Sequence, residues 1–390
     1  MTQKLQDVDL MGSDEMADPA VTATKLLAGK RAYYYDKFSP SFYIFSRYED
    51  VNSALLDAAT YIEGHGNGPT FQPPLGVLSD APHHTYIRNL IQPDFLAKKI
   101  SDLQPRLEEI VHELLDAVAS KPVWDLHDDL SFPLPVIIIC EMLGMPTDDI
   151  GKFKRWADAS VARMCAEDPE PYIQQLDEMH AYLLEQLKLK RAAATADDLL
   201  GLIAHSKQNG EYLSDDEAVG LAVQIFVAGN ETTTSLISNL IWRLMTIDDL
   251  WRDYCRGDID TDNLITESLR FDPPLLGLFK TTSKELQIDD VTIPSNTKVM
   301  MHYGAANRDP SAFPEPDRFD AHRTGKKQLS FSVGLHVCIG RELAKLEARV
   351  TLTALRERCP DLTLVNEGER VGPFLFWGRS KLPVTLNRST

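Results

Sequence analysis

The segment from Phe331 to Gly340, which reads FSVGLHVCIG, constrains what this chain can fold into more than any other stretch. It places Cys338 just before a predicted helix over residues 341–359, with Gly334 and Gly340 on either side of the cysteine. Glycine permits positive φ angles and a close approach of the backbone. The free N–H groups at the start of a helix favour a thiolate over a thiol. The segment therefore predicts a single thiolate held at a helix N-terminus.

A buried, inert thiol is the alternative for Cys338, because free cysteine is commonly a small core residue. The residues at fixed offsets around it, Phe331, Gly334, His336 and Gly340, favour a metal ligand instead. A lone thiolate suits a haem iron that cleaves an O–O bond, because it donates electron density to the metal. We therefore expect Cys338 to be the axial iron ligand.

A second motif, AGNETT over residues 228–233, lies in a predicted long helix over residues 215–245. Glu231 and Thr232 place an acid next to a hydroxyl, a pair that can deliver protons to bound oxygen. An ordinary helix surface is the alternative, but consecutive threonines lower helix propensity without an evident gain. The motif predicts that Glu231 and Thr232 are catalytic.

The patterning along the chain predicts a mainly helical protein with small sheets near both ends. No linker or repeat divides it, so residues 1–390 are expected to form one domain with a short polar tail over roughly residues 1–18. Residues 62–80 read as a loop rich in glycine and proline. The other expected elements are a short sheet within residues 1–60, helices over 84–194 and 262–271, and strands over 286–303 and from 374 onward.

Charge and cysteine content exclude several classes of protein. A net charge of -18 argues against a nucleic-acid binder, which needs a basic surface. Five widely spaced cysteines without a C-x-x-C pair argue against a disulfide scaffold or a structural zinc site. The N-terminus lacks the apolar stretch of a signal peptide, and the strongest apolar run, residues 134–145, is too short to span a membrane. We expect a cytoplasmic protein.

With HTYIR at 84–88, AGNETT, ESLR at 267–270 and FSVGLHVCIG in this order, the chain resembles the cytochrome P-450 family of bacterial, soluble type. Ser332 stands where family loops often carry glycine. The resemblance implies a P-450 fold with haem b between the long central helix and the helix after the cysteine. It implies a monomeric monooxygenase that inserts one oxygen atom of O2 into an apolar small molecule, with electrons from a ferredoxin and an NAD(P)H-dependent reductase.

The resemblance also assigns roles that the residues alone do not. His84 and Arg88 share a helix face that would otherwise be read as solvated, and the family uses this pair to bind a haem propionate. His336 and Lys280 are further propionate contacts by analogy, although many relatives carry arginine at the second position and lysine cannot bind in a bidentate manner. Ala228 and the loop residues of the cysteine segment are expected to contact the haem.

Glu267 and Arg270 form an i,i+3 pair that in isolation would be a surface ion pair. In the resembled family this pair is buried and meets an arginine of the following meander. The matching residue here is taken to be Arg318, and the three are expected to support the thiolate loop.

The candidate substrate lining is apolar and aromatic, which fits terpenoids, steroids, fatty acids or substituted aromatics equally well. It comprises Phe71, Gln224, Val227, Ala228, Leu275, Leu276, Leu278, Leu375 and Phe376. Gln224 has two interpretations of equal weight: a polar contact to substrate, or a hydrogen bond to a neighbouring helix.

Arg341, Lys345 and Arg349 lie at i, i+4 and i+8 on the helix that follows Cys338, and form one basic stripe. We expect an acidic ferredoxin to dock on this stripe, because rim charges steer association. The alternative is pairing with Glu342 and Glu347 along the same helix.

Other functions remain open from the sequence alone. A peroxygenase is weaker, because relatives of that kind typically lack the acid–alcohol pair. A haem sensor would need an output module, and no segment is spare for one. A haem-free isomerase or lyase would contain no haem on purification.

Overall fold

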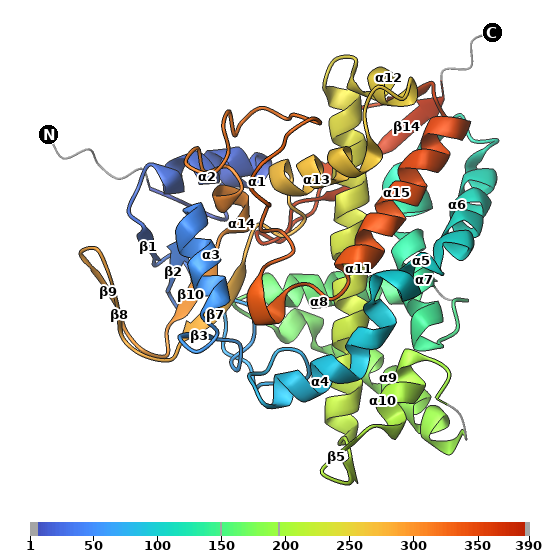
Figure 1. The fold of residues 1–390 in the computed structure, drawn as a ribbon. Coiled ribbons are helices and arrows are strands. Elements are labelled where there is room, and N and C mark those ends of the chain that lie inside the picture. Colours follow the sequence, from blue (N-terminus) through green and yellow to red (C-terminus); the bar gives the residue numbers. More distant parts are fainter. Residues whose placement is uncertain (1–6, 149, 194–195, 387–390) are drawn as a thin grey trace, which may run out of the picture.

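A single long helix organises the molecule, and the sequence placed it well. The computed structural model describes residues 7–148, 150–193 and 196–386. The predicted helix over 215–245 is α11 (Asp215–Thr246), and its N-cap Ser214 accepts a hydrogen bond from the N–H of Glu217. Figure 1 shows α11 running through the middle of the fold, with the main sheet on one side and α6, α7 and α15 on the other.

Helices and strands of the described residues follow the expected order, with more short helices near the N-terminus than the pattern suggested. The α-helices are α1 (Ser13–Ala17), α2 (Pro19–Leu27), α3 (Tyr48–Leu56), α4 (His83–Ile91), α5 (Ala97–Ser101), α6 (Gln104–Val118), α7 (Pro133–Leu143), α8 (Ile150–Cys165), α9 (Ile173–Ala192), α10 (Leu199–His205), α11, α12 (Leu250–Cys255), α13 (Thr261–Phe271), α14 (Tyr303–Ala306) and α15 (Arg341–Arg358). The strands are β1 (Ala32–Tyr35), β2 (Phe42–Phe45), β3 (Tyr61–Ile62), β4 (Val123–Asp125), β5 (Lys207–Gln208), β6 (Glu211–Tyr212), β7 (Leu278–Thr282), β8 (Leu286–Ile288), β9 (Val291–Ile293), β10 (Lys298–Met301), β11 (Leu362–Leu364), β12 (Glu369–Arg370), β13 (Arg379–Lys381) and β14 (Pro383–Leu386).

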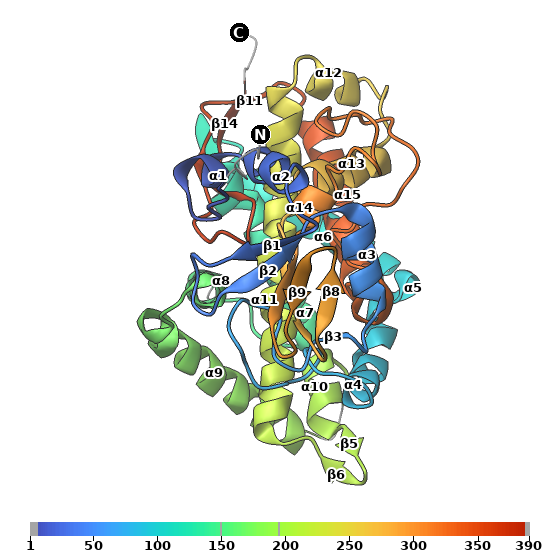
Figure 2. The ribbon, with the colours of Figure 1, turned by 90° about the vertical axis from the view of Figure 1, so that its left-hand side faces the viewer.

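The largest sheet joins strands near the N-terminus with strands between residues 278 and 301, in the order β1-β2-β10-β7-β3. Strand β10 pairs parallel to β2 and antiparallel to β7, and β7 pairs antiparallel to β3. Seen after a quarter turn, the sheet lies in front of α11 with α1 and α2 toward one end (Figure 2). The pairing of β3 with β7 brings the start of loop 62–80 next to residues near Lys280.

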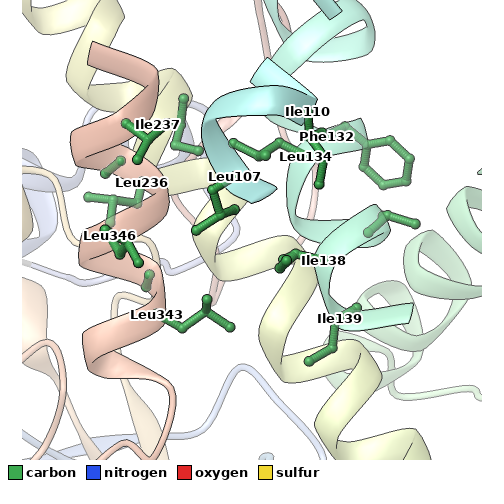
Figure 3. Packing of buried hydrophobic residues seen from close by; sticks show 14 of the residues in the cluster. Leu107, Ile110, Phe132, Leu134, Ile138, Ile139, Leu236, Ile237, Leu343 and Leu346 are labelled. Carbon is green, nitrogen blue, oxygen red and sulfur yellow. The ribbon is translucent and has the colours of Figure 1, made fainter. Parts of the chain in front are cut away.

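The main apolar core lies between α6, α7, α11 and α15 (Figure 3). Leu107 of α6, Ile138 of α7, Leu236 of α11 and Leu346 of α15 are all buried in it. The apolar run predicted at 134–145 forms α7, which packs inside this core. Among the residues that the structure describes, no helix combines the length and the apolar character that crossing a membrane requires.

Two sequence expectations at the chain ends are wrong in part. The predicted polar tail over 1–18 is wrong from residue 8, because Val8 and Leu10 are buried in the core formed with β1 and β2; residues 1–6 lie outside the described part. The strand expected from Phe374 begins only at Arg379. Residues 374–377 instead form a buried turn whose backbone meets Leu275 and Leu276. Alternating patterns alone do not separate such a turn from a strand.

Candidate active site

The cysteine segment folds into a tight loop that ends at α15. The N–H of Cys338 donates to the carbonyl of Phe331 at 2.8 Å and closes the loop. Gly334 has φ +76°, and a Cβ there would lie 2.8 Å from the carbonyl oxygen of Leu55, so glycine is required. Gly340 differs from expectation, since its φ is -83° and needs no glycine. Ser332 itself adopts φ +58°, which explains why glycine suits this position in related loops.

The thiol of Cys338 experiences opposing influences. Desolvation by the surrounding protein raises its pKa although the residue is exposed, while the N–H groups of Gly340 and Arg341 and the charges of Arg88 and Arg341 lower it. The backbone donors are those at the start of α15, as the helix-terminus argument predicts. Desolvation outweighs them in the protein alone, but a coordinated metal cation deprotonates a thiol outright. The donor set therefore fits a thiolate ligand that forms when the metal binds.

A buried cluster of nitrogen groups lies near the thiol. The rings of His84 in α4 and His336 in the cysteine loop have centroids 4.2 Å apart. Burial, followed by the charge of Lys280, lowers the pKa of His336 to about 2, and burial with the charges of Arg88 and Lys280 lowers that of His84. The four residues predicted from the family pattern thus influence one another in one place.

Two ring nitrogens of this cluster are buried and lack a hydrogen-bond partner among the described residues: Nδ1 of His84 and Nε2 of His336. Buried polar atoms are normally paired, so such orphans indicate a missing polar group. Neutral imidazoles beside a guanidinium and an ammonium suit carboxylates. The cluster therefore fits the propionate side of a haem whose iron Cys338 would hold.

The acid–alcohol pair lies in the middle of α11. The hydroxyl of Thr232 donates to the carbonyl oxygen of Ala228 at 2.8 Å, a bond that competes with the helical ladder. Ala228 is exposed although Phe226 and Asn230 beside it are buried. Burial raises the pKa of Glu231 to about 7, with a further contribution from Asp158 on α8. A carboxyl with this pKa can accept and release protons near neutral pH.

The buried pair behind the loop has a different third partner from the one predicted. Arg270 donates through Nη2 and Nε to the carboxylate of Glu267 at 2.7 and 2.8 Å. The second guanidinium on this carboxylate belongs to Arg323, with Nε at 3.1 and 3.2 Å from the two oxygens. Arg318 is a wrong assignment: its side chain is 65% exposed beside Glu315, and it contributes only its carbonyl oxygen.

The conformation of the meander, residues 314–323, explains why Arg318 was assigned in place of Arg323. Residues 314–318 curl around the guanidinium of Arg323, which donates to the carbonyl oxygens of Pro314, Glu315 and Arg318. The path that turns Arg323 inward depends on these bonds and on the contact with Glu267, which is distant in sequence, so position in the motif could not identify it. Arg323 was the residue that sequence reasoning missed here.

Four of the nine predicted substrate-lining residues lie in two backbone-paired segments. The N–H of Leu276 donates to the carbonyl of Leu375 at 2.8 Å, and Leu275 bridges to Phe376. Leu375 is fully buried in the core, whereas Phe71 is 43% exposed. The remaining predicted lining residues, Val227 and Leu278, are half-buried.

Gln224 forms hydrogen bonds with the loop over residues 62–80. Its amide Nε2 donates to the carbonyl of Leu75 at 2.8 Å, and its Oε1 accepts from the N–H of Val77 at 3.0 Å. Leu75 also lies over Gly220, where a Cβ would come within 2.2 Å of Leu75 Cδ2. The side chain of Gln224 is therefore bonded within the fold, as the second interpretation expected, but its partner is this loop and not a neighbouring helix.

The predicted basic stripe lies on the surface side of α15. Arg341 pairs with Glu342 at 3.0 Å, Arg349 with Asp262 at 2.7 Å, and the ammonium of Lys345 lies over the ring of Phe331. Glu347 is not a partner of the stripe, because it is buried and burial raises its pKa well above the usual value. Lys98 and Lys99 of the neighbouring α5 are exposed.

The class that this fold and this site define is that of the haem-thiolate oxidoreductases. The cytochrome P450 family model matches residues 261–360. The chain is 34% identical over 362 residues to cytochrome P450 107B1 of Saccharopolyspora erythraea, covering 88% of each protein. It is 33% identical over 356 residues to the vitamin D(3) 25-hydroxylase of Pseudonocardia autotrophica, again covering 88% of each.

Solved structures agree with these relatives. The structure of CYP109Q5 from Chondromyces apiculatus superposes with a TM-score of 0.85 at 31% identity and covers 98% of both chains. That of CYP109E1 from Bacillus megaterium in complex with testosterone gives 0.88 at 26% identity, covering 96% of this chain and 100% of that one. The chain belongs to the cytochrome P450 family, and it is a P450 monooxygenase with the haem cofactor that the family implies.

Proposed function

We propose that this protein binds haem b, with Cys338 as the axial ligand, and inserts one oxygen atom of O2 into an apolar small organic molecule. The observation that carries the proposal is the pair of orphaned buried imidazole nitrogens beside Arg88 and Lys280, near the thiol. When bound, the haem supplies the metal at which dioxygen is activated. His84, Arg88, Lys280 and His336 would hold its propionates.

Glu231 and Thr232 are proposed to deliver protons to oxygen that would be bound at the haem site. The Thr232 hydroxyl is anchored on Ala228, so its oxygen is held on the same helix face as that exposed residue. Glu231 is buried next to it, and a carboxyl with a pKa of about 7 exists in both protonation states at working pH. Together they can pass a proton from the protein to a reacting oxygen.

A bulky apolar substrate is the class best supported. The chain is similar to a vitamin D(3) 25-hydroxylase and to a structure solved with testosterone, and it is 36% identical over 312 residues to the 6-deoxyerythronolide B hydroxylase of Saccharopolyspora erythraea. The half-buried Val227, Leu275 and Leu278 suit such a molecule. A screen of steroids and macrolides for displacement of the iron-bound water, read in the Soret band, tests the class against fatty acids.

An acidic ferredoxin is the proposed electron donor. Arg341 and Lys345 of α15, with Lys98 and Lys99 of α5, give a basic surface on a protein of net charge -18. Charge reversal at Arg341 and Lys345 should slow reduction of the haem by ferredoxin at low salt and leave the peroxide-driven reaction intact. Equal reduction rates across a salt series would place docking elsewhere.

The overall proposal is tested by the absorption spectrum of the reduced, CO-bound protein, followed by NADPH turnover with surrogate redox proteins. A thiolate-type spectrum with substrate-dependent product supports the monooxygenase. The same spectrum without turnover on any substrate favours a sensor, product formed only with peroxide favours a peroxygenase, and purification without haem favours an isomerase or lyase.

A further inference from the structure

Glu63 is a buried carboxylate that the site as described does not use. It follows strand β3 directly, and because Ile62 pairs with Thr281, Glu63 lies across from Lys280 in β7. The Lys280 Nζ to Glu63 Oε1 distance is 2.5 Å, and both side chains are buried, at 5% and 8% exposed. The second oxygen of Glu63, Oε2, has no hydrogen-bond partner in the part of the chain that the structure describes.

A second lysine is buried near the same carboxylate. Lys298 in β10 is 1% exposed, and its ammonium donates to the carbonyl oxygens of His65 and Gly66 at 2.7 and 2.6 Å. Burial lowers the pKa of Lys298 to about 8, and the charge of Glu63 opposes that shift. Glu63 is therefore the carboxylate that serves two buried ammonium groups.

Lys280 connects Glu63 with the propionate cluster, because the charge of Lys280 lowers the pKa of both His84 and His336. The cations of the described residues near this edge include Arg88, Lys280 and Lys298. Beside Glu63 lies a second carboxylate, that of Asp80, which accepts from the N–H groups of Glu63 and Gly64 at 2.9 and 2.8 Å and acts on His84. Uncompensated buried charge is costly, so further negative charge is expected at this edge. The propionates of a haem are such negative groups, and they would meet imidazoles whose lowered pKa keeps them uncharged.

We propose that Glu63 is a positioning residue, which fixes the ammonium of Lys280 at the propionate edge and, as a buried carboxylate there, lowers the reduction potential of the haem iron. This inference rests on the haem of the proposed function. Lysine at this position needs such a partner, because its flexible stem and single ammonium lack the rigid fork by which arginine binds carboxylates. A buried negative charge disfavours the reduced iron, which carries one positive charge fewer than the oxidised iron.

The test is a spectroelectrochemical titration that measures the midpoint potential of the substrate-free, haem-loaded protein. Glu63→Gln keeps the shape of the side chain and removes its charge, so the potential should rise. We expect about a tenfold shift of the reduction equilibrium, or about 59 mV for one electron. Glu63→Asp retains the charge and should stay near the wild-type potential, whereas Lys280→Gln should lower it.

The matched control is Glu49→Gln, which removes the same charge from an exposed pair with Lys326. It should leave the potential unchanged, and the Glu63 effect should persist at high salt because buried charges are poorly screened. An unchanged or lowered potential in Glu63→Gln would overturn the inference. If that variant does not fold, an unchanged potential in Lys280→Gln overturns it equally. A wild-type protein without haem would instead contradict the proposed function.

Discussion

The cysteine loop with α15, here called the thiolate side, and the loop over residues 62–80, here called the substrate side, are held in place by different kinds of interaction. On the thiolate side, Cys338, Gly334 and α15 follow one another in sequence, and the loop closes on its own backbone through Phe331. On the substrate side, the loop over residues 62–80 is held by partners far along the chain, Gln224 on α11 and Lys298 on β10. The thiolate side can be predicted from the local sequence. The contacts of the substrate side join segments that are far apart in the chain, so they are evident only in the folded structure.

The largest effect is expected at the centre of the thiolate side. Cys338→Ala removes the proposed thiolate ligand, which would donate charge to the iron. The thiolate-type CO spectrum should disappear and monooxygenation should fall below detection. Cys338→His retains a nitrogen ligand and should keep haem without activity. Survival of the thiolate spectrum in Cys338→Ala would show that this loop does not ligate the iron.

Arg323 and Arg318 offer a matched pair behind the same loop. Arg323→Ala removes one of the two guanidinium groups from the buried Glu267 and leaves it with Arg270 and the N–H of Asp320, so we expect a loss of about 3–5 kcal/mol in the free energy of unfolding. Arg318→Ala removes an exposed side chain and should cost less than about 0.5 kcal/mol. Chemical denaturation of the two variants measures both values. The reverse order would restore the sequence-based assignment of Arg318.

Proton delivery on α11 should respond to pH in a manner that depends on Glu231. Its pKa of about 7 means that the carboxyl can donate below that pH and is increasingly ionised above it. Product formed per NADPH should therefore fall as pH rises through 7, and this dependence should be lost in Glu231→Gln. Thr232→Ala should divert several-fold more NADPH to peroxide with nearly unchanged substrate affinity. Unaltered coupling in both variants would exclude the role.

The smallest effect is expected at the loop contact of the substrate side. Gln224→Leu removes two hydrogen bonds to the loop backbone. The free energy of the local opening that exposes the Val77 amide should fall by about 1–2 kcal/mol, and hydrogen exchange at this amide should become roughly tenfold faster. Gly220→Ala should also speed exchange at the Val77 amide, because the added Cβ would displace Leu75. Gln174→Leu, on the surface of α9, is the control. If exchange is unchanged and only polar substrates bind more weakly, Gln224 contacts substrate instead.

Local patterns predicted the helices that carry the chemistry and left the long-range partners unidentified. The periodicity and cap of α11, the prolines after α13 and the glycine loop before α15 are all encoded within a few residues. Arg323 and Glu63 owe their roles to contacts with segments about 56 and 217 residues away. No local period distinguishes such residues from exposed arginines and glutamates.

The continuous 32-residue α11 also determines which changes in chain length the protein tolerates. Each residue of a helix turns the following side chains by about 100°. One residue inserted between Ser214 and Glu231 would rotate the acid and the hydroxyl away from their present direction, or unwind the N-terminal turns that Ser214 caps. An insertion near Gly210, where a side chain would meet nothing within 4 Å, moves no such residue. Length variation among homologues should therefore gather in the turn before the helix.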